Sequence, residues 1–215
     1  MPGDPSPAPS FTVLLVCTGN ICRSALAERL GRAYLDDVLG EQAASVRLVS
    51  AGTRAVVGSA MHALTEPVLR GFGTTSGDFS AQQLTESLAV GADLTLTMTR
   101  SHRREVLGLA PRALSRTFTL REAADLLGLV VEGWEPVGNR LEERARSLAK
   151  ALAAARARRT GGDHDDVPDP IGGPAEAHAK AGEMVAGALL PLLGAIAGTA
   201  PGHGPDDTPV GAPQL

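Results

Sequence analysis

The sequence predicts an α/β fold, a three-layer, doubly wound sheet of about four parallel strands with helices on both faces. Short apolar runs rich in β-formers alternate along the chain with longer segments that repeat apolar residues every three or four positions. A strand, a helix and a strand in that order form a right-handed unit, and several such units build a parallel sheet covered on both faces.

The first unit occupies residues 11–49. Residues 11–16 form an apolar run between a proline-rich segment and Gly19-Asn20, which predicts a buried strand. Residues 24–39 predict an amphipathic helix that ends at Gly40, and residues 46–49 predict the second strand. The helix has apolar residues at Leu26, Leu30, Tyr34 and Val38.

Two further strands are predicted at 92–98 and 116–120. The predicted helices lie at 63–72, at 101–109 with Ser101 as its cap, from Arg121 onward, at 139–159 and at 175–196. Residues 126–138, which hold the only tryptophan, Trp134, are less regular, and residues 161–174 predict a loop rich in Gly, Asp and Pro.

The 215 residues fit one domain at 11–198, in which 128–162 comprises a partly irregular insertion and an Ala/Arg-rich helix. The segments 1–10 and 199–215 are rich in Pro and Gly and are predicted to be disordered tails. The net charge of −4 argues against nucleic-acid binding. No run of about 18 apolar residues appears, so we expect no membrane span.

The chain contains two cysteines, Cys17 and Cys22, which lie too close together to form a disulfide framework. A reducing, cytoplasmic location is therefore expected. Two cysteines in one short loop point to chemistry rather than to a structural role.

That loop, residues 16–24, runs from the end of the first strand to the start of the first helix. Parallel sheets bind ligands at this position, and loop amides together with a helix N-terminus bind phosphate. The same positive potential lowers the pKa of cysteine thiols, so Cys17 is expected to react as a thiolate. Arg23 follows six residues later and can hold two phosphoryl oxygens with its planar guanidinium. Ser24 can donate a hydrogen bond to the thiolate or to the leaving group.

The loop resembles the signature C-x-G-N-x-C-R-S of the low-molecular-weight protein tyrosine phosphatases. Its defined positions are occupied by Cys17, Gly19, Asn20, Cys22, Arg23 and Ser24. Segments 50–53, 92–98, 101–104 and 118–122 also look like bacterial members, so the resemblance covers roughly residues 11–193.

The resemblance implies a cysteine-dependent phosphatase acting on a phosphoprotein, with phosphotyrosine as the expected substrate. Cys17 would attack phosphorus and form a phosphocysteine that water hydrolyses. Asn20 and Ser50 would hold the loop, and Ser24 would tune the thiolate. Cys22 is where the family can form a reversible disulfide with its nucleophile. The phosphate would be bound by Thr18, Gly19, Asn20, Ile21, Cys22 and Arg23.

The leaving oxygen needs a proton, which a carboxylic acid can supply. In the family this acid is an aspartate immediately before a proline, ahead of the last helix, and Asp169-Pro170 matches that position. Asp166 is the alternative. Many members carry an aromatic residue after Asp-Pro, whereas this chain has Ile171, which leaves the preference for phosphotyrosine less specified than the phosphatase chemistry.

We expect no cofactor and no metal site. The run Asp163, His164, Asp165 and Asp166 is too compact for all its side chains to face one ion. Three further histidines, His62, His102 and His178, are isolated in sequence and are expected to have surface or capping roles, as is His203. The basic helix at 139–159 is interpreted as a solvated face, and nothing in the sequence indicates an oligomeric state.

Two other functions compete. Arsenate reduction uses a similar loop but requires further cysteines to relay the oxidation, and this chain has none outside the loop. A catalytically weak phosphoprotein-binding module is the second alternative, and it is favoured if Asp169 lies outside the pocket.

Overall fold

A computed structural model describes residues 10–131, 135 and 137–199 of the chain. The predicted tails lie outside the described residues except for Ser10 and Thr199, and so does Trp134.

The described residues form a four-stranded sheet that confirms the predicted fold class. Its strands are β1 (Phe11–Cys17), β2 (Val46–Gly52), β3 (Leu94–Thr97) and β4 (Thr117–Thr119). All neighbouring strands are parallel, and their order is β2-β1-β3-β4. Strand β1 is therefore central, and its carboxyl end is flanked by β2 and β3, where open parallel sheets bind ligands.

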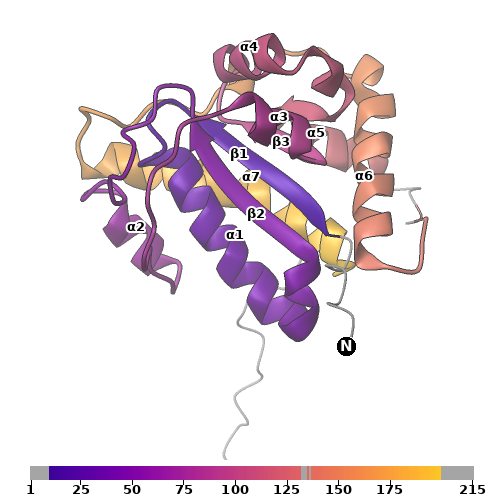
Figure 1. Cartoon of the computed structure of the whole chain (residues 1–215), viewed down its shortest axis with the longest axis horizontal. Coiled ribbons are helices and arrows are strands. Elements are labelled where there is room, and N and C mark those ends of the chain that lie inside the picture. The colour runs from indigo at the N-terminus through magenta and orange to yellow at the C-terminus, as the bar shows by residue number, and fades with distance from the viewer. Residues whose placement is uncertain (1–9, 132–134, 136, 200–215) are drawn as a thin grey trace, which may run out of the picture.

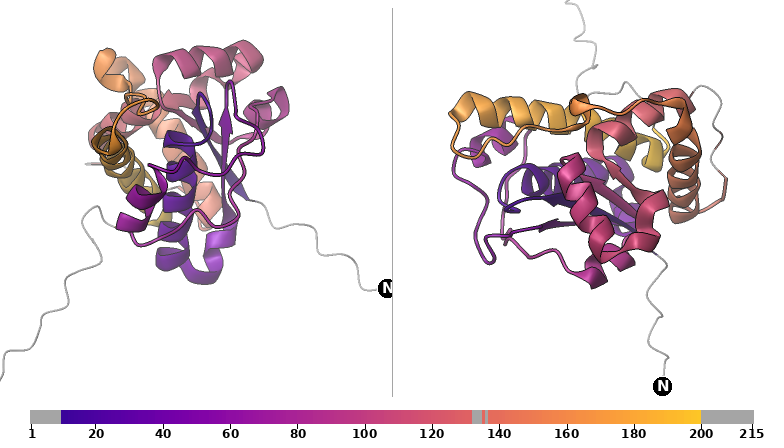
Figure 2. Two further views of the ribbon diagram at one scale, coloured as in Figure 1. Left: turned by 90° about the vertical axis from the view of Figure 1, so that its left-hand side faces the viewer. Right: turned by 90° about the horizontal axis from the view of Figure 1, so that it is seen from above.

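Helices cover both faces of this sheet (Figures 1 and 2). Side chains of β1 alternate between two hydrophobic cores because successive residues of a strand point to opposite faces. Phe11, Val13, Leu15 and Cys17 face one core, whereas Leu14 and Val16 face the other. The helices of the described residues are α1 (Arg23–Leu39), α2 (Glu66–Gly71), α3 (Glu86–Gly91), α4 (Arg100–Leu109), α5 (Leu120–Val130), α6 (Leu141–Ala155) and α7 (Ala175–Ala197).

The first core lies between the sheet and α1, α5, α6 and α7, and the second lies under α3 and α4. The side chain of Cys17 belongs to the first core, so it points toward the side on which α1 and α7 pack against each other.

Most helix starts differ from the prediction by one to three residues, and α2 begins at Glu66 instead of residue 63. Helix α4 is capped by Thr99, whose hydroxyl accepts from the backbone N–H of His102, so Ser101 is not its cap. Helix α5 begins directly after β4, where Thr119 and Glu122 form a capping box. Helix α3 was not predicted, and α5 extends through Val130 into the segment expected to be irregular.

Helix α7 is long and apolar enough to cross a membrane by composition, with a mean hydropathy of 1.4 in its most apolar window. Within the protein, 56% of that window is buried, and the helix packs against α1 and α5. At Gly182 a Cβ atom would lie 2.5 Å from Cγ1 of Val68, so close helix packing requires glycine there. This burial is typical of a core helix, and the absence of a membrane span stays a prediction.

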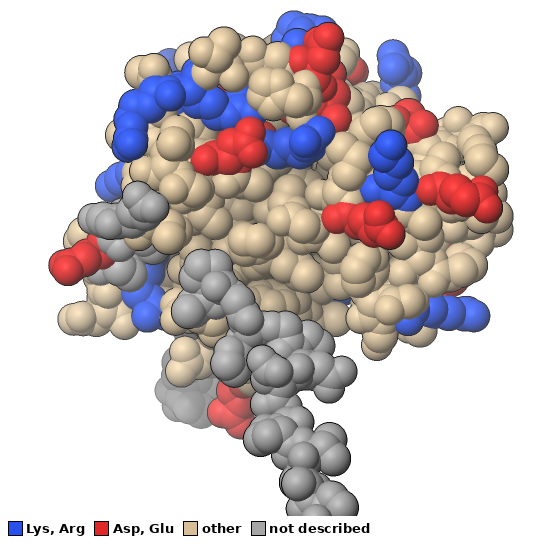
Figure 3. Space-filling model, turned by 180° about the vertical axis from the view of Figure 1, so that it is seen from behind, with Lys and Arg blue, Asp and Glu red and all other residues tan. Residues whose placement is uncertain are grey.

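The basic helix predicted at 139–159 becomes α6 and a short 3-10 turn, and most of its arginines pair with carboxylates. Arg146 binds Asp93 at 3.1 Å, and Arg156 binds Glu122 at 2.8 Å. Figure 3 shows basic and acidic side chains interleaved on the face seen from behind. A continuous basic patch is not formed there by the described residues.

Candidate active site

The loop after β1 is held by its carbonyl groups. The carbonyls of Cys17, Thr18 and Gly19 accept from the amides of Thr53, Arg54 and Val56 at 2.9–3.0 Å. The carbonyl of Ile21 likewise accepts from His62 N–H at 2.8 Å. With the carbonyls turned outward, the amides of residues 19–22 donate to no other described residue. They are left free to form an anion-binding nest at the start of α1.

Gly52, at the end of β2, allows this close approach. A Cβ atom at this position would lie 2.4 Å from the carbonyl oxygen of Thr18. Any larger residue would push the segment after β2 away from the loop whose carbonyls it binds.

A directed series of hydrogen bonds ends on the sulfur of Cys17. The Glu28 carboxylate accepts from the Ser50 hydroxyl at 2.6 Å, so the Ser50 oxygen is available to accept from Asn20 Nδ2 at 2.8 Å. Asn20 Nδ2 also donates to Ser24 Oγ at 3.0 Å. The Ser24 oxygen lies 2.9 Å from Cys17 Sγ, and because it already accepts from Asn20, its own hydroxyl hydrogen can be donated to the sulfur.

Asn20 is fixed at both ends of its side chain and in its backbone. Its Oδ1 accepts from Gln82 N–H at 2.8 Å, which sets the orientation of the amide group. Among the described residues it is the only one other than glycine with a positive φ, +55°. Asparagine tolerates this left-handed conformation better than most residues. The loop therefore depends on Asn20 for both its backbone turn and its hydrogen bonds.

Arg23 begins α1 and its side chain is 4% exposed. Its NH2 donates to Asp169 Oδ2 at 2.6 Å, and its NH1 donates to the Val167 carbonyl at 2.9 Å. The guanidinium therefore reaches across the pocket to the segment ahead of α7. That segment is also anchored to the residue that follows β3, because Val167 N–H donates to the Met98 carbonyl at 2.8 Å.

The two candidate acids have different surroundings. Asp169 lines the pocket with Cys17 and Arg23. Asp166 instead accepts from the backbone N–H of Arg100 at 2.7 Å and from its guanidinium at 3.1 Å. Asp166 is thus bound to the start of α4, while Asp169 faces the loop.

The pocket over the loop has a volume of about 240 Å³. Its floor is the loop itself, and its wall includes the aliphatic side chains of Ile21, Val56 and Ile171. Arg54 adds a cation at the rim, so the site combines an anion-binding floor with an apolar wall.

His102, which was expected to have a surface or capping role, is 4% exposed and supports the loop. Its Nε2 bonds Thr18 Oγ1 at 2.9 Å, and its Nδ1 bonds Thr99 Oγ1 at 2.9 Å. Burial lowers the pKa of His102 to about 4, and the Arg23 cation adds to the effect. The ring is neutral at pH 7, and it connects the cap of α4 to the phosphate loop.

All the residues predicted for the loop, together with Ser50 and Asp169, lie together in this structure. Sequence reasoning missed Glu28, Gln82 and His102. Glu28 lies four residues after Ser24 on the same helix, a spacing that places both side chains on one face and could have indicated a position near the loop. The other two carried no comparable signal.

Comparisons with known proteins agree with these observations. A profile of the family described as low molecular weight phosphotyrosine protein phosphatase matches residues 12–158, a range that ends before Asp169. A solved low molecular weight protein tyrosine phosphatase from T. tengcongensis has a TM-score of 0.60 and 30% identity, covering 86% of this chain and 97% of that one.

Two relatives differ in the substrate that their names state. The chain is 31% identical over 148 residues to the probable low molecular weight protein-tyrosine-phosphatase AmsI of Erwinia amylovora, covering 66% of this chain and 97% of the relative. It is also 30% identical over 157 residues to a protein-arginine-phosphatase of Bacillus subtilis, covering 67% of this chain and 98% of the relative.

Replacing Asn20 with alanine should weaken the binding of inorganic phosphate by about 10-fold or more. The left-handed turn loses the side-chain hydrogen bonds of Asn20, and its backbone strain of about 1–3 kcal/mol is then no longer offset. Calorimetric titration with phosphate measures this change. The matched control is Asn139→Ala, since Asn139 is exposed and its one hydrogen bond within the described residues runs from its backbone N–H to Glu143. Equal phosphate affinity in both variants would show that Asn20 does not shape the nest.

Proposed function

The chain belongs to the low molecular weight protein tyrosine phosphatase family, and from this premise we propose that Cys17 is the nucleophile with which it hydrolyses phosphotyrosine in proteins. Membership of this family makes the protein a phosphatase. The observation that carries the role of Cys17 is the series of hydrogen bonds that delivers the Ser24 hydroxyl to its sulfur.

In the first step the Cys17 sulfur attacks phosphorus and forms an S–P bond, while the bond from phosphorus to the substrate oxygen breaks. The loop amides and Arg23 bind the non-bridging oxygens, on which negative charge is concentrated. The departing oxygen takes a proton from the Asp169 carboxyl group. The products are a phosphocysteine and a neutral alcohol or phenol.

The second step reverses the role of Asp169. Its carboxylate accepts a proton from a water molecule whose oxygen attacks phosphorus, and the S–P bond breaks to release inorganic phosphate and the thiolate. No metal or organic cofactor enters either step.

Arg23 changes partners during this cycle. Its NH2 group pairs with Asp169 at 2.6 Å, and a phosphate dianion on the loop competes for the same N–H groups. Substrate binding therefore releases Asp169 from the guanidinium while the side chain still lines the pocket. The exchange places the acid beside the leaving group only when a phosphate is bound.

The residues of the pocket wall favour an aryl phosphate over phosphoarginine as the substrate. A phosphoarginine side chain carries several N–H donors that need acceptors when they are buried. Ile21, Val56 and Ile171 offer none, and Arg54 repels a second cation. Asp169 is the single carboxylate among the lining residues, and the mechanism above uses it as the proton donor to the leaving group.

We place the enzyme in the cytoplasm as one phosphatase domain covering residues 11–198. Both cysteines are free thiols, which suits a reducing compartment. The placement of Asp169 in the pocket argues against a catalytically weak binding module, and the lack of a third cysteine in the sequence argues against arsenate reduction.

Replacing Cys17 with serine should abolish the turnover of p-nitrophenyl phosphate, because a neutral hydroxyl is a far weaker nucleophile than a thiolate at this position. Release of p-nitrophenol measures the change, and calorimetric titration with vanadate checks that the variant still binds an oxyanion. If neither the wild type nor the variant turns over while both bind phosphate, the protein is a binding module.

Replacing Asp169 with asparagine should lower kcat for phenyl phosphate by about 100-fold or more, because the phenolate must leave without a proton. The loss should be smaller for p-nitrophenyl phosphate, whose leaving group is stable as an anion. The affinity for phosphate should not fall, since Arg23 loses a competing partner.

The matched control for this experiment is Asp166→Asn, which removes a carboxylate bound to Arg100 instead of one in the pocket. A loss of kcat that depends on the leaving group in Asp166→Asn, and not in Asp169→Asn, would transfer the role of acid to Asp166.

A phosphotyrosine peptide should be hydrolysed with a kcat/KM about 100-fold or more above that of a matched phosphoarginine peptide, because the wall leaves guanidine N–H groups unpaired. Phosphate release from the two peptides measures the ratio. The variant Ile171→Phe should raise kcat/KM for aryl phosphates by about 2- to 10-fold through stacking, and leave alkyl phosphates unchanged. A higher rate on phosphoarginine would contradict the substrate assignment.

A further inference from the structure

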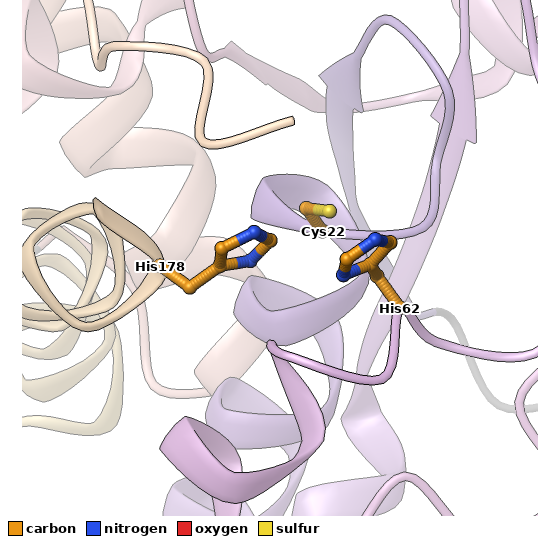
Figure 4. Close-up of side chains that lie close together, drawn as sticks. All are labelled: Cys22, His62 and His178. Carbon is orange, nitrogen blue, oxygen red and sulfur yellow. The ribbon is translucent and has the colours of Figure 1, made fainter. Parts of the chain in front are cut away.

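A cluster of three metal-binding side chains lies beside the phosphate loop and takes no part in the chemistry above. It consists of Cys22 from the residue before α1, His62 from the segment before α2, and His178 from the first turns of α7. One ligand atom of each residue lies within 4.8 Å of the other two. Figure 4 shows that the sulfur and both imidazole rings converge on one region.

His178 has a polar atom that is buried without a partner. Its side chain is 1% exposed, and Nε2 has no hydrogen-bond partner among the described residues. A buried polar atom without a partner is unusual in a well-packed region, because the loss of its bonds to water is not offset. In Figure 4 this side of the ring faces Cys22, so the atom points into the cluster.

Thr65 prepares His178 to bind a metal ion. The Thr65 hydroxyl oxygen lies 2.9 Å from His178 Nδ1. With the proton on Nδ1, the lone pair of Nε2 faces the cluster, and a second-shell bond of this kind fixes the tautomer of metal-binding histidines.

The space beside these atoms fits one ion. A cavity of about 10 Å³, close to the volume of one water molecule, is lined by Cys22 and His178 and also by Arg23. His62 does not line this cavity, so it must turn toward Cys22 and His178 to bind the same ion. One thiolate and two imidazoles are ligands that zinc prefers, and a fourth position can be taken by water.

We propose that Cys22, His62 and His178 form a zinc site that joins the phosphate loop to the segment before α2 and to α7. This site departs from the expectation that the chain holds no metal, which considered only the acidic run 163–166. It also departs from the expectation that His62 and His178 are isolated, because their rings stack with centroids 4.8 Å apart.

Zinc binding requires two local changes. The rings are nearly parallel, at 11°, so one of them must turn to aim its nitrogen at the ion. His62 is the freer ring, since it is partly exposed and followed by the exposed Ala63 and Leu64. Its Nδ1 accepts from Leu64 N–H at 3.2 Å. Binding of the ion through Nε2 requires the ring proton to move to Nδ1, so this one exposed hydrogen bond is lost.

Cys22 must also lose a proton. The Cys22 side chain is buried, and zinc binds cysteine as the thiolate. Zinc displaces this proton when it binds, and the affinity for zinc therefore rises with pH.

A second group, Asp125, His164 and Asp165, has ligand atoms equally close together, but it already holds a cation. Arg159 binds Asp125 at 2.6 Å and also pairs with Asp165. Because the guanidinium satisfies these carboxylates, His164 provides a matched control for the zinc experiment.

The test is a competition titration of Zn²⁺ between the full chain and a chromophoric chelator. The wild type should bind one zinc ion per chain, and His62→Asn should weaken binding by about 10-fold or more. The variant His164→Asn should bind as the wild type does. Equal affinity in the wild type and His62→Asn, or no binding by the wild type, would overturn the proposal.

A second measurement separates the two thiols. Cobalt(II) in place of zinc should give a cobalt–thiolate charge-transfer absorption that persists in Cys17→Ser and disappears in Cys22→Ser. Loss of this absorption in Cys17→Ser alone would place the ion on the nucleophile and overturn the proposal. Circular dichroism of both variants excludes unfolding as the cause of the loss.

Discussion

One acceptor, the carboxylate of Glu28, sets the direction of the hydrogen bonds on which the phosphate loop depends. An ionised carboxylate only accepts, so the Ser50 hydroxyl must donate to it, and Ser50 in turn receives from Asn20. Asn20 Nδ2 also donates to the Ser24 oxygen, so the hydrogen of the Ser24 hydroxyl is not used in that bond and can be donated to the sulfur of Cys17. The sulfur is thereby presented with a donor, and the loop amides remain available for an anion.

The parallel sheet makes this arrangement possible. Strand β1 is central, and the end of β2 approaches so closely that its last residue, Gly52, has no room for a side chain beside Thr18. On the other side of β1, the carbonyl of Met98, directly after β3, accepts from Val167 N–H. This bond holds the segment that carries Asp169 over the loop. The nucleophile, the phosphate clamp and the acid thus come from segments far apart in sequence that meet at one edge of the sheet.

The sequence predicted the parts of the site that lie within one short motif. Residues 17–24 are contiguous, and their spacing carries the chemistry directly. The prediction of Asp169 required the family resemblance. In the structure Asp169 contacts Arg23, whereas Asp166 contacts Arg100. Gln82 and His102 could not be predicted, because they reach the loop through contacts that span 62 and 84 residues. Helix α3 was missed because six residues are too few to show a helical repeat.

Arg23 donates to the Val167 carbonyl and to Asp169 with different nitrogens, so one side chain both clamps the phosphate and tethers the segment that carries the acid. The energetic contributions of Arg23 and Asp169 are consequently not separable by single substitutions. Removing the arginine also unties the aspartate, and the two losses overlap instead of adding. A double-mutant cycle on this pair would report a strong coupling energy, and evolutionary drift at either position would be constrained by the other.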